Sequence, residues 1–186
     1  MIKKPENWNE TRTTIDEVVA SDYASLKVGP YIVKIVDVED WPNLEYLKLF
    51  VDIADGELKG EFTRQEAQFG NWPAQGIGYR SYKDKAIDFF TAFIVAVEKS
   101  NKNFIFDWNN PDCLKGKYFV ANYAEEEYLK DGQIKTSVKI REYRSIESFK
   151  AGKVKPLAIK KYTGPVPTAT ATAPVPAPDD NRLPWE

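Results

Sequence analysis

Histidine is absent from this chain of 186 residues, and cysteine occurs once, at Cys113. Without histidine, the chain lacks the commonest general base and the commonest metal ligand of proteins. A single cysteine excludes an internal disulfide framework and zinc sites of the Cys/His kind. No apolar run approaches the roughly 18 residues that span a membrane, and the N-terminal stretch lacks the apolar region of a secretory signal. We therefore expect a cytoplasmic protein that makes no contact with a membrane.

The acidic residues also lack a spacing typical of a metal or catalytic site. In an extended strand the run Glu125-Glu126-Glu127 would point alternate carboxylates to opposite faces, whereas metal-dependent nucleases need dispersed acids around one cleft. The sequence also has no phosphate-binding loop and no nucleophile turn. We expect a protein that is not an enzyme, with no catalytic residue, metal or cofactor, and a nuclease is the weakest of our hypotheses.

What is present indicates one globular domain followed by a tail. Hydrophobic residues make up 42% and aromatic residues 13% of the chain, which is enough for a single core over residues 1–163. Charge is unevenly distributed: from Lys130 to Lys161 there are ten basic and three acidic residues, a net charge of +7. We expect this basic stretch to lie on the surface, where it either binds an anionic partner or is simply solvated.

The tail divides into a linker and a tip. Residues 164–178 contain five prolines, and the rest are mostly alanine, threonine and valine, a composition typical of a disordered, extended linker. Residues 179–186 form an acidic, aromatic tip that is predicted to bind partner proteins. An ordinary frayed terminus is the alternative. The residues predicted to bind a partner are Asp179, Asp180, Leu183, Pro184 and Trp185.

The order of predicted elements favours a mainly β fold. Period-two alternation and β-branched residues predict strands at residues 31–38, 44–54, 58–64, 117–124 and 133–143. A broad apolar stripe at helical spacing predicts a helix over residues 82–99. Three strands, one helix and two strands is the order of the OB-fold, a five-stranded Greek-key barrel with one helix between strands 3 and 4, which often binds oligonucleotides.

The strand at residues 44–54 has one apolar and one mixed face. Leu47, Leu49, Val51 and Ile53 share a side, so Tyr46, Lys48 and Phe50 point the other way. Aromatic rings that stack on bases beside a cation that neutralises phosphate are typical of single-strand binding. The alternative is that the two rings are buried under a neighbouring segment.

Two further segments are predicted to contribute. On residues 133–143 the basic and aromatic side chains share one parity, which predicts a positive stripe or else a solvated edge strand. The loop of residues 65–80 is predicted to form a stacking flap, unless Trp72 packs onto the core as a lid. The predicted DNA-binding residues are Tyr46, Lys48, Phe50, Arg64, Trp72, Tyr79, Arg80, Lys135, Lys139, Arg141 and Tyr143.

The stretches YIVKIVDVED, LEYLKLFVDIADGELKGEF and LKGKYFVANYAEEEYLKDGQIKTSVKIREYRSIESFKAGKVK resemble phage-encoded single-stranded DNA-binding proteins. The resemblance covers most of residues 25–161. The tail is similar to the acidic tip of bacterial single-strand-binding proteins, but Trp185 stands where those have phenylalanine, and Glu186 follows it. This departure suggests a phage-encoded reader of the tip rather than the usual host pocket.

The resemblance implies a non-catalytic single-stranded DNA-binding protein of phage DNA replication or recombination. Its partners would be single-stranded DNA and, through the tip, replication or recombination proteins. The acidic tip could also compete with DNA for a basic groove, because a tether raises its effective concentration. The alternative is an OB-like protein-interaction module without nucleic acid. The sequence is compatible with a homodimer.

Overall fold

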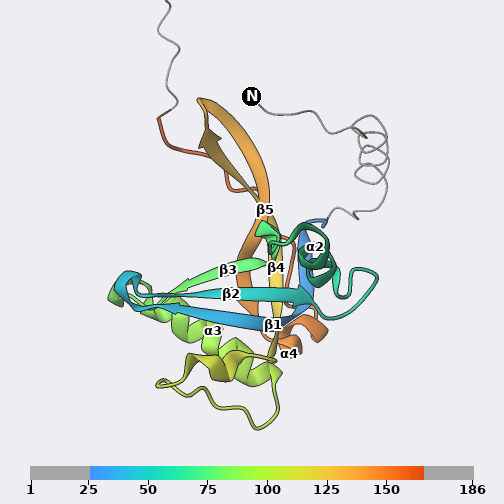
Figure 1. Ribbon diagram of the computed structural model, residues 1–186, viewed down its shortest axis with the longest axis vertical. Coiled ribbons are helices and arrows are strands. Elements are labelled where there is room, and N and C mark those ends of the chain that lie inside the picture. Colours follow the sequence, from blue (N-terminus) through green and yellow to red (C-terminus); the bar gives the residue numbers. More distant parts are fainter. Residues whose placement is uncertain (1–25, 166–186) are drawn as a thin grey trace, which may run out of the picture.

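A computed structural model describes residues 26–165 of the chain. Five strands form one antiparallel, open sheet in the order β3-β2-β1-β4-β5 (Figure 1). The strands are β1 (Gly29–Trp41), β2 (Tyr46–Ile53), β3 (Ile77–Ser81), β4 (Tyr118–Lys130) and β5 (Gln133–Arg144). The predicted mainly β class is confirmed. The predicted linker and tip, residues 164–178 and 179–186, lie almost entirely outside the described residues.

A tight hairpin joins β1 to β2, as the Trp-Pro-Asn sequence predicts. A short 3₁₀ turn (Pro42–Leu44) connects them, and Glu45 completes it in the left-handed region at φ 55°. The register pairs Trp41 with Tyr46 and Glu39 with Lys48. Side chains of directly paired residues point to the same side of a sheet, so this hairpin places two aromatic residues next to each other.

The prediction of a strand at residues 58–64 is wrong. The chain instead forms helix α2 (Glu61–Phe69) and a 3₁₀ turn (Ala74–Gly76), and the third strand, β3, comes later at Ile77–Ser81. Residues 61–69 are mostly good helix formers, and the Gln65 amide donates to the Glu61 carboxylate four residues earlier (3.0 Å). Propensity over this window was the signal for a helix.

Asp52, at the end of β2, caps α2 from outside the helix. Its carboxylate accepts hydrogen bonds from the backbone N–H of Phe62 (3.0 Å) and of Thr63 (3.2 Å), and from the Thr63 hydroxyl. Gly60, at the capping position, has no side chain for this task and adopts φ 75°. A cap from a distant strand cannot be recognised from a local sequence pattern, because the usual signal is a polar residue at the cap itself.

Helix α3 (Ile87–Ser100) packs against the sheet and follows a 3₁₀ turn (Asp84–Ala86). The helix was predicted over residues 82–99. Phe93 contacts the rings of Phe119 (5.8 Å between centroids) and Tyr143 (5.3 Å). The core joins α3 to the inner face of the sheet, and its residues include Val33, Ile35, Leu47, Leu49, Val51, Phe90, Phe93, Val97, Leu114, Phe119 and Tyr123. A 3₁₀ turn (Pro111–Leu114) leads into β4.

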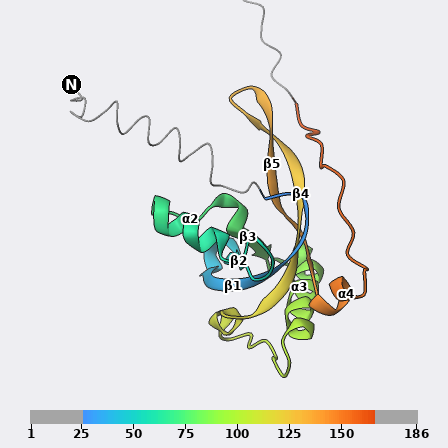
Figure 2. The same ribbon diagram turned by 90° about the vertical axis from the view of Figure 1, so that its right-hand side faces the viewer.

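The β4–β5 hairpin is longer than predicted and projects from the sheet as an arm (Figures 1 and 2). Pairing runs from Val120↔Arg144 to Lys130↔Gln133. Asp131 and Gly132 close the hairpin with φ values of 54° and 73°, the two positive values that a type I′ turn requires. Along its whole length β5 pairs only with β4, so it is an edge strand of the sheet.

Beyond helix α4 (Ile146–Lys150), the chain turns back and runs beside the arm (Figure 2). We call residues 154–163 the strap. Lys160 exchanges backbone hydrogen bonds with Glu125 and Glu127, each 2.9 Å long. The strap therefore adds a short parallel bridge to the edge of β4 that β1 leaves free.

The two edge strands of the sheet approach each other through side chains. A Cβ atom placed on Gly78 of β3 would lie 2.5 Å from the hydroxyl of Tyr143 on β5. Only a residue without a side chain fits at this position. The sheet is therefore strongly curved, with β3 and β5 in contact but not joined in a continuous ladder.

Candidate nucleic-acid interface

The outer side of β1, β2 and β3 presents aromatic rings. On β2, Leu47, Leu49, Val51 and Ile53 are at most 2% exposed, which confirms the predicted alternation. Tyr46 and Lys48 therefore point outward, and the register adds Trp41 from β1 and Tyr79 from β3 on the same side. We call this surface the aromatic face, made of Trp41, Tyr46, Lys48, Phe50 and Tyr79.

Three rings of the aromatic face are in contact. Trp41 stacks on Tyr46, with centroids 5.3 Å apart and planes at 28°. Tyr79 meets Tyr46 edge-on at 5.6 Å. Trp41 is 40% and Tyr79 56% exposed, so both rings are accessible to a flat ligand such as a nucleobase.

Lys48, at the centre of this face, already has partners. Its Nζ lies 3.2 Å from a carboxylate oxygen of Glu39 and 4.4 Å from the centre of the Phe50 ring. The indole N–H of Trp41 donates to the same Glu39 oxygen (3.1 Å). The predicted cation is present, but its charge is largely balanced, so stacking dominates what this face can do.

Trp72 covers one end of the aromatic face rather than forming a free flap. Its ring meets Phe50 edge-on at 6.0 Å, and its indole N–H donates to the carbonyl of Gly76 (3.0 Å). Both rings are half-buried. The structure thus places Trp72 as a lid, the alternative that the sequence left open.

Tyr79 and Arg80, predicted to act together, lie on opposite sides of β3. Tyr79 pairs with Lys48 on the outer side, whereas Arg80 pairs with the buried Leu47. The Arg80 guanidinium carbon lies 3.4 Å from the centre of the Tyr143 ring, and that ring stacks on Phe119 at 5.3 Å and 12°. Arg80 is therefore held in place by an aromatic residue of β5.

A bulge in β5 breaks the predicted single-sided stripe. Lys139 pairs with Ala124 and Ile140 with Tyr123, but the pairing then jumps to Glu142 with Asn122. Arg141 is the extra residue, and Tyr143 lies on the core side. Burial raises the pKa of the Tyr143 hydroxyl, and Arg80 opposes this shift. Parity alone cannot place side chains beyond a bulge.

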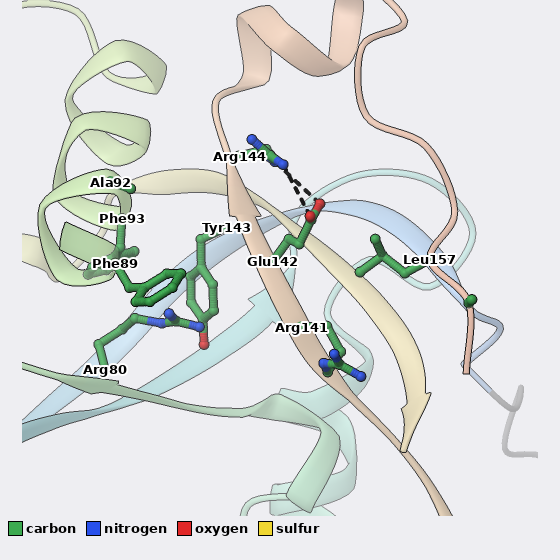
Figure 3. A pocket seen from close by; sticks show the side chains of 10 residues that line it. Arg80, Phe89, Ala92, Phe93, Arg141, Glu142, Tyr143, Arg144 and Leu157 are labelled. Atoms are coloured by element: carbon green, nitrogen blue, oxygen red, sulfur yellow. Dashed lines mark hydrogen bonds and ion pairs between the residues drawn. The ribbon is translucent and has the colours of Figure 1, made fainter. Parts of the chain in front are cut away.

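Arg80 and Arg141 line one cavity of about 490 Å³ between α3 and β5 (Figure 3). We call it the arginine groove. Arg80 Nε and Arg141 Nη1 are buried and lack a hydrogen-bond partner. Within residues 26–165 neither arginine forms an ion pair, whereas Arg144 binds Glu142 (3.1 Å). The other lining residues are Phe89, Ala92, Phe93, Tyr143, Leu157 and Ala158.

A smaller cavity of about 290 Å³ lies at the junction of β3 and β5. Its lining includes Tyr79 of the aromatic face, Tyr143 of the arginine groove, and Lys139. The two surfaces therefore meet at the edge of β3.

Part of the basic C-terminal stretch forms ion pairs with acidic residues of the protein itself. Lys160 Nζ lies 2.6 Å from Glu126 and Lys161 Nζ 2.7 Å from Glu127. The Lys160 hydrogen bond lowers the pKa of Glu126, and the Lys161 hydrogen bond lowers that of Glu127. On the arm, Lys139 lies 3.9 Å from Glu126, and Lys135 is exposed opposite Tyr128.

Arg64 lies outside both surfaces. It belongs to α2, where its guanidinium pairs with Glu61 and donates to the carbonyl of Lys59 (3.1 Å). The predicted partner-binding residues lie outside the described residues; they are Asp179, Asp180, Leu183, Pro184 and Trp185.

Over the described part of the chain, no three Asp, Glu or Cys side chains cluster closely enough to hold a metal ion. In the same part, no helix is both long and apolar enough to cross a bilayer.

Sequence reasoning missed Trp41 and Phe89. The sequence predicts Trp41 within the turn, whereas β1 continues to Trp41 and the hairpin register then pairs it with Tyr46. Phe89 is 71% exposed on α3, although it lies within an apolar helix. Its position beside the apolar stripe, rather than within it, was the available signal.

Comparison with models of known protein families found no match, and comparison with curated protein sequences found none either. A functional assignment therefore depends on the residues and geometry described above.

Proposed function

We propose that the protein is a non-catalytic single-stranded DNA-binding protein built on an OB-type barrel. The observation that supports it best is the aromatic face, where Trp41, Tyr46 and Tyr79 are in contact and partly exposed on adjacent strands. A role in phage DNA replication or recombination follows only from the sequence resemblance.

The OB-type barrel is supported by strand order and curvature. The order β3-β2-β1-β4-β5 is what a five-stranded barrel shows when it is opened between its third and fifth strands. The close contact of Gly78 with Tyr143 lies at that opening. Helix α3 falls between β3 and β4 in the chain, as proposed for this fold.

Stacking explains why such a face would bind any sequence. Every base has a π-face, and one base on an aromatic side chain contributes roughly 1–3 kcal/mol. Because Lys48 is balanced by Glu39, this face supplies stacking rather than charge. The phosphates would need cations elsewhere on the surface.

The test is a titration with oligo(dT), followed by tryptophan fluorescence at low salt. Trp41 lies on the proposed site, so binding should quench emission, and Trp41→Phe should remove much of that quenching. Trp108→Phe is the control, because Trp108 is 62% exposed but lines a different cavity, with Phe90 and Phe106. Labelled single strands should stay intact when Mg²⁺ is added, since the proposal includes no catalysis.

One observation favours the alternative, a protein-interaction module. Ion pairs within the protein balance Lys48, Lys160 and Lys161, so the surface is less basic than the sequence indicates. Failure of oligo(dT) to quench wild-type fluorescence or to bind by anisotropy at low salt would favour this alternative over DNA binding.

A further inference from the structure

The arginine groove contains charged nitrogen atoms that the protein does not satisfy. Arg80 Nε and Arg141 Nη1 are buried without an acceptor. A buried charged donor without a partner costs more than an ordinary unpaired polar group. The other charges in the groove are a matched pair, since Arg144 holds Glu142 at 3.1 Å. The groove is therefore suited to bind a negatively charged ligand.

Arg80 is positioned before any ligand arrives. Its guanidinium lies 3.4 Å above the Tyr143 ring, and that ring is fixed by stacking on Phe119 and by edge contact with Phe93. The tight fit against Gly78 prevents Tyr143 from moving toward β3. A cation held in this way loses little side-chain freedom on binding.

The arrangement suits a chain of anions better than one small anion. Figure 3 shows Arg80 lying against Tyr143 while Arg141 projects from β5 at a separate point of the groove. Phe89 lines the same groove and is 71% exposed. Two guanidinium groups at separate points of the groove can each bind a phosphate of one chain, because arginine forms strong charge-assisted bonds to phosphate. An exposed ring beside them matches a base.

We infer that the arginine groove is a second contact for the same single strand, binding its phosphodiesters through Arg80 and Arg141 and one base on Phe89. The inference rests on the proposed function. The strand would leave the aromatic face at Tyr79, cross the edge of β3 beside Lys139, where the smaller cavity lies, and enter the groove. The aromatic face would then bind bases, and the groove would bind phosphates and one further base.

The test compares oligo(dT) with an abasic strand of equal length, measured by anisotropy over a range of salt concentrations. Arg141→Gln should weaken both ligands about ten-fold at low salt and reduce the salt slope for oligo(dT) by about 0.7, the value for one lost phosphate contact on a single strand. Phe89→Ala should lower the affinity for oligo(dT) several-fold and leave the affinity for the abasic strand unchanged. The charge-matched control is Lys102→Gln, at an exposed residue after α3, which should change neither the affinities nor the salt slope.

Each outcome separates this inference from the proposed function. If Arg141→Gln and Phe89→Ala leave oligo(dT) binding unchanged while Tyr79→Ala weakens it, the groove inference is wrong and the proposed function stands. If oligo-glutamate binds the wild type but not Arg141→Gln, and oligo(dT) affinity is the same for both, the groove recognises an acidic peptide and the inference is again wrong. If wild-type protein binds no oligo(dT), both fail. Because Phe89 is largely exposed, its variant tests the groove even if Arg141→Gln does not fold.

Discussion

On the aromatic face, Lys48 lies 3.2 Å from Glu39 and packs against the ring of Phe50, whereas neither Arg80 nor Arg141 in the arginine groove forms an ion pair within residues 26–165. The two surfaces meet at the edge of β3, yet they offer a ligand different chemistry. Stacking depends weakly on salt, while phosphate contacts release counterions and depend on it strongly. Salt dependence is therefore the property that separates their contributions.

The junction between the surfaces can be broken at one position. Gly78→Ala would place a methyl group 2.5 Å from the Tyr143 hydroxyl, and Tyr143 cannot move aside because Phe93 and Phe119 hold its ring. Overpacking of this kind costs about 1–3 kcal/mol of unfolding free energy. Urea denaturation should show the loss as a lower midpoint.

The double variant Gly78→Ala with Tyr143→Phe is the matched control. It removes the hydroxyl that clashes, and the next atoms of Tyr143 and Ile140 lie at an ordinary 3.5 Å. Most of the lost stability should return. A double variant as unstable as Gly78→Ala alone would show that the edge strands do not touch as described.

The aromatic face should respond to ring removal without a change in salt slope. Tyr79→Ala deletes a ring that is 56% exposed, and we expect oligo(dT) affinity to fall about ten-fold, within the range for one stacked base. Tyr118→Ala, at a tyrosine that is 39% exposed at the start of β4, is the control and should bind normally. A reduced salt slope in Tyr79→Ala would mean that this face also contacts phosphate.

Removing the acid beside Lys48 should make the aromatic face behave more like the groove. Glu39→Gln frees the ammonium group from its carboxylate, so a phosphate could take that place. We expect affinity to rise a few-fold at low salt and the salt slope to steepen by up to about 0.7. Glu57→Gln, an exposed acid in the loop before α2, makes the same change in net charge and should have little effect. Equal gains in both variants would indicate only a general effect of net charge.

The sequence predicted the aromatic face better than the groove, and the reason is periodicity. Along β2, period-two alternation holds throughout, so Tyr46, Lys48 and Phe50 were placed on the correct side. On β5 the bulge at Arg141 shifts the phase, and Tyr143 lies on the core side instead. A bulge leaves little trace in a single sequence, because the extra residue needs no special side chain.

Long-range contacts explain the remaining differences. Residues 58–64 were predicted as a strand, but Asp52 caps the helix that forms there from ten residues away. Arg80 was grouped with Tyr79 because they are neighbours in sequence, yet adjacent residues of a strand face opposite sides. Had the third strand been placed at Ile77–Ser81, the separation of these two residues would have followed directly.

The strap contributes to the arginine groove but not to the aromatic face, and this difference gives the smallest effect that we predict. Leu157 and Ala158 of the strap line the arginine groove, while the aromatic face is built only from β1, β2 and β3. Hydrogen bonds from Lys160 and Lys161 lower the pKa values of Glu126 and Glu127 below the ordinary 4.5. Carboxylates with a depressed pKa in the folded state stabilise it above their unfolded pKa, and this contribution is lost as the pH falls through the folded value.

We therefore expect acid to loosen the strap, because its bridge is held by these two carboxylates. As the pH falls below 4.5, the amide NMR signals of Glu127 and Lys160, which are hydrogen bonded across the bridge, should shift together. Glu126→Gln with Glu127→Gln should remove this titration, because the two carboxylates that pair with Lys160 and Lys161 are then gone. Signals of Glu127 and Lys160 that shifted in the double variant as they do in the wild type would show that the bridge does not depend on these carboxylates.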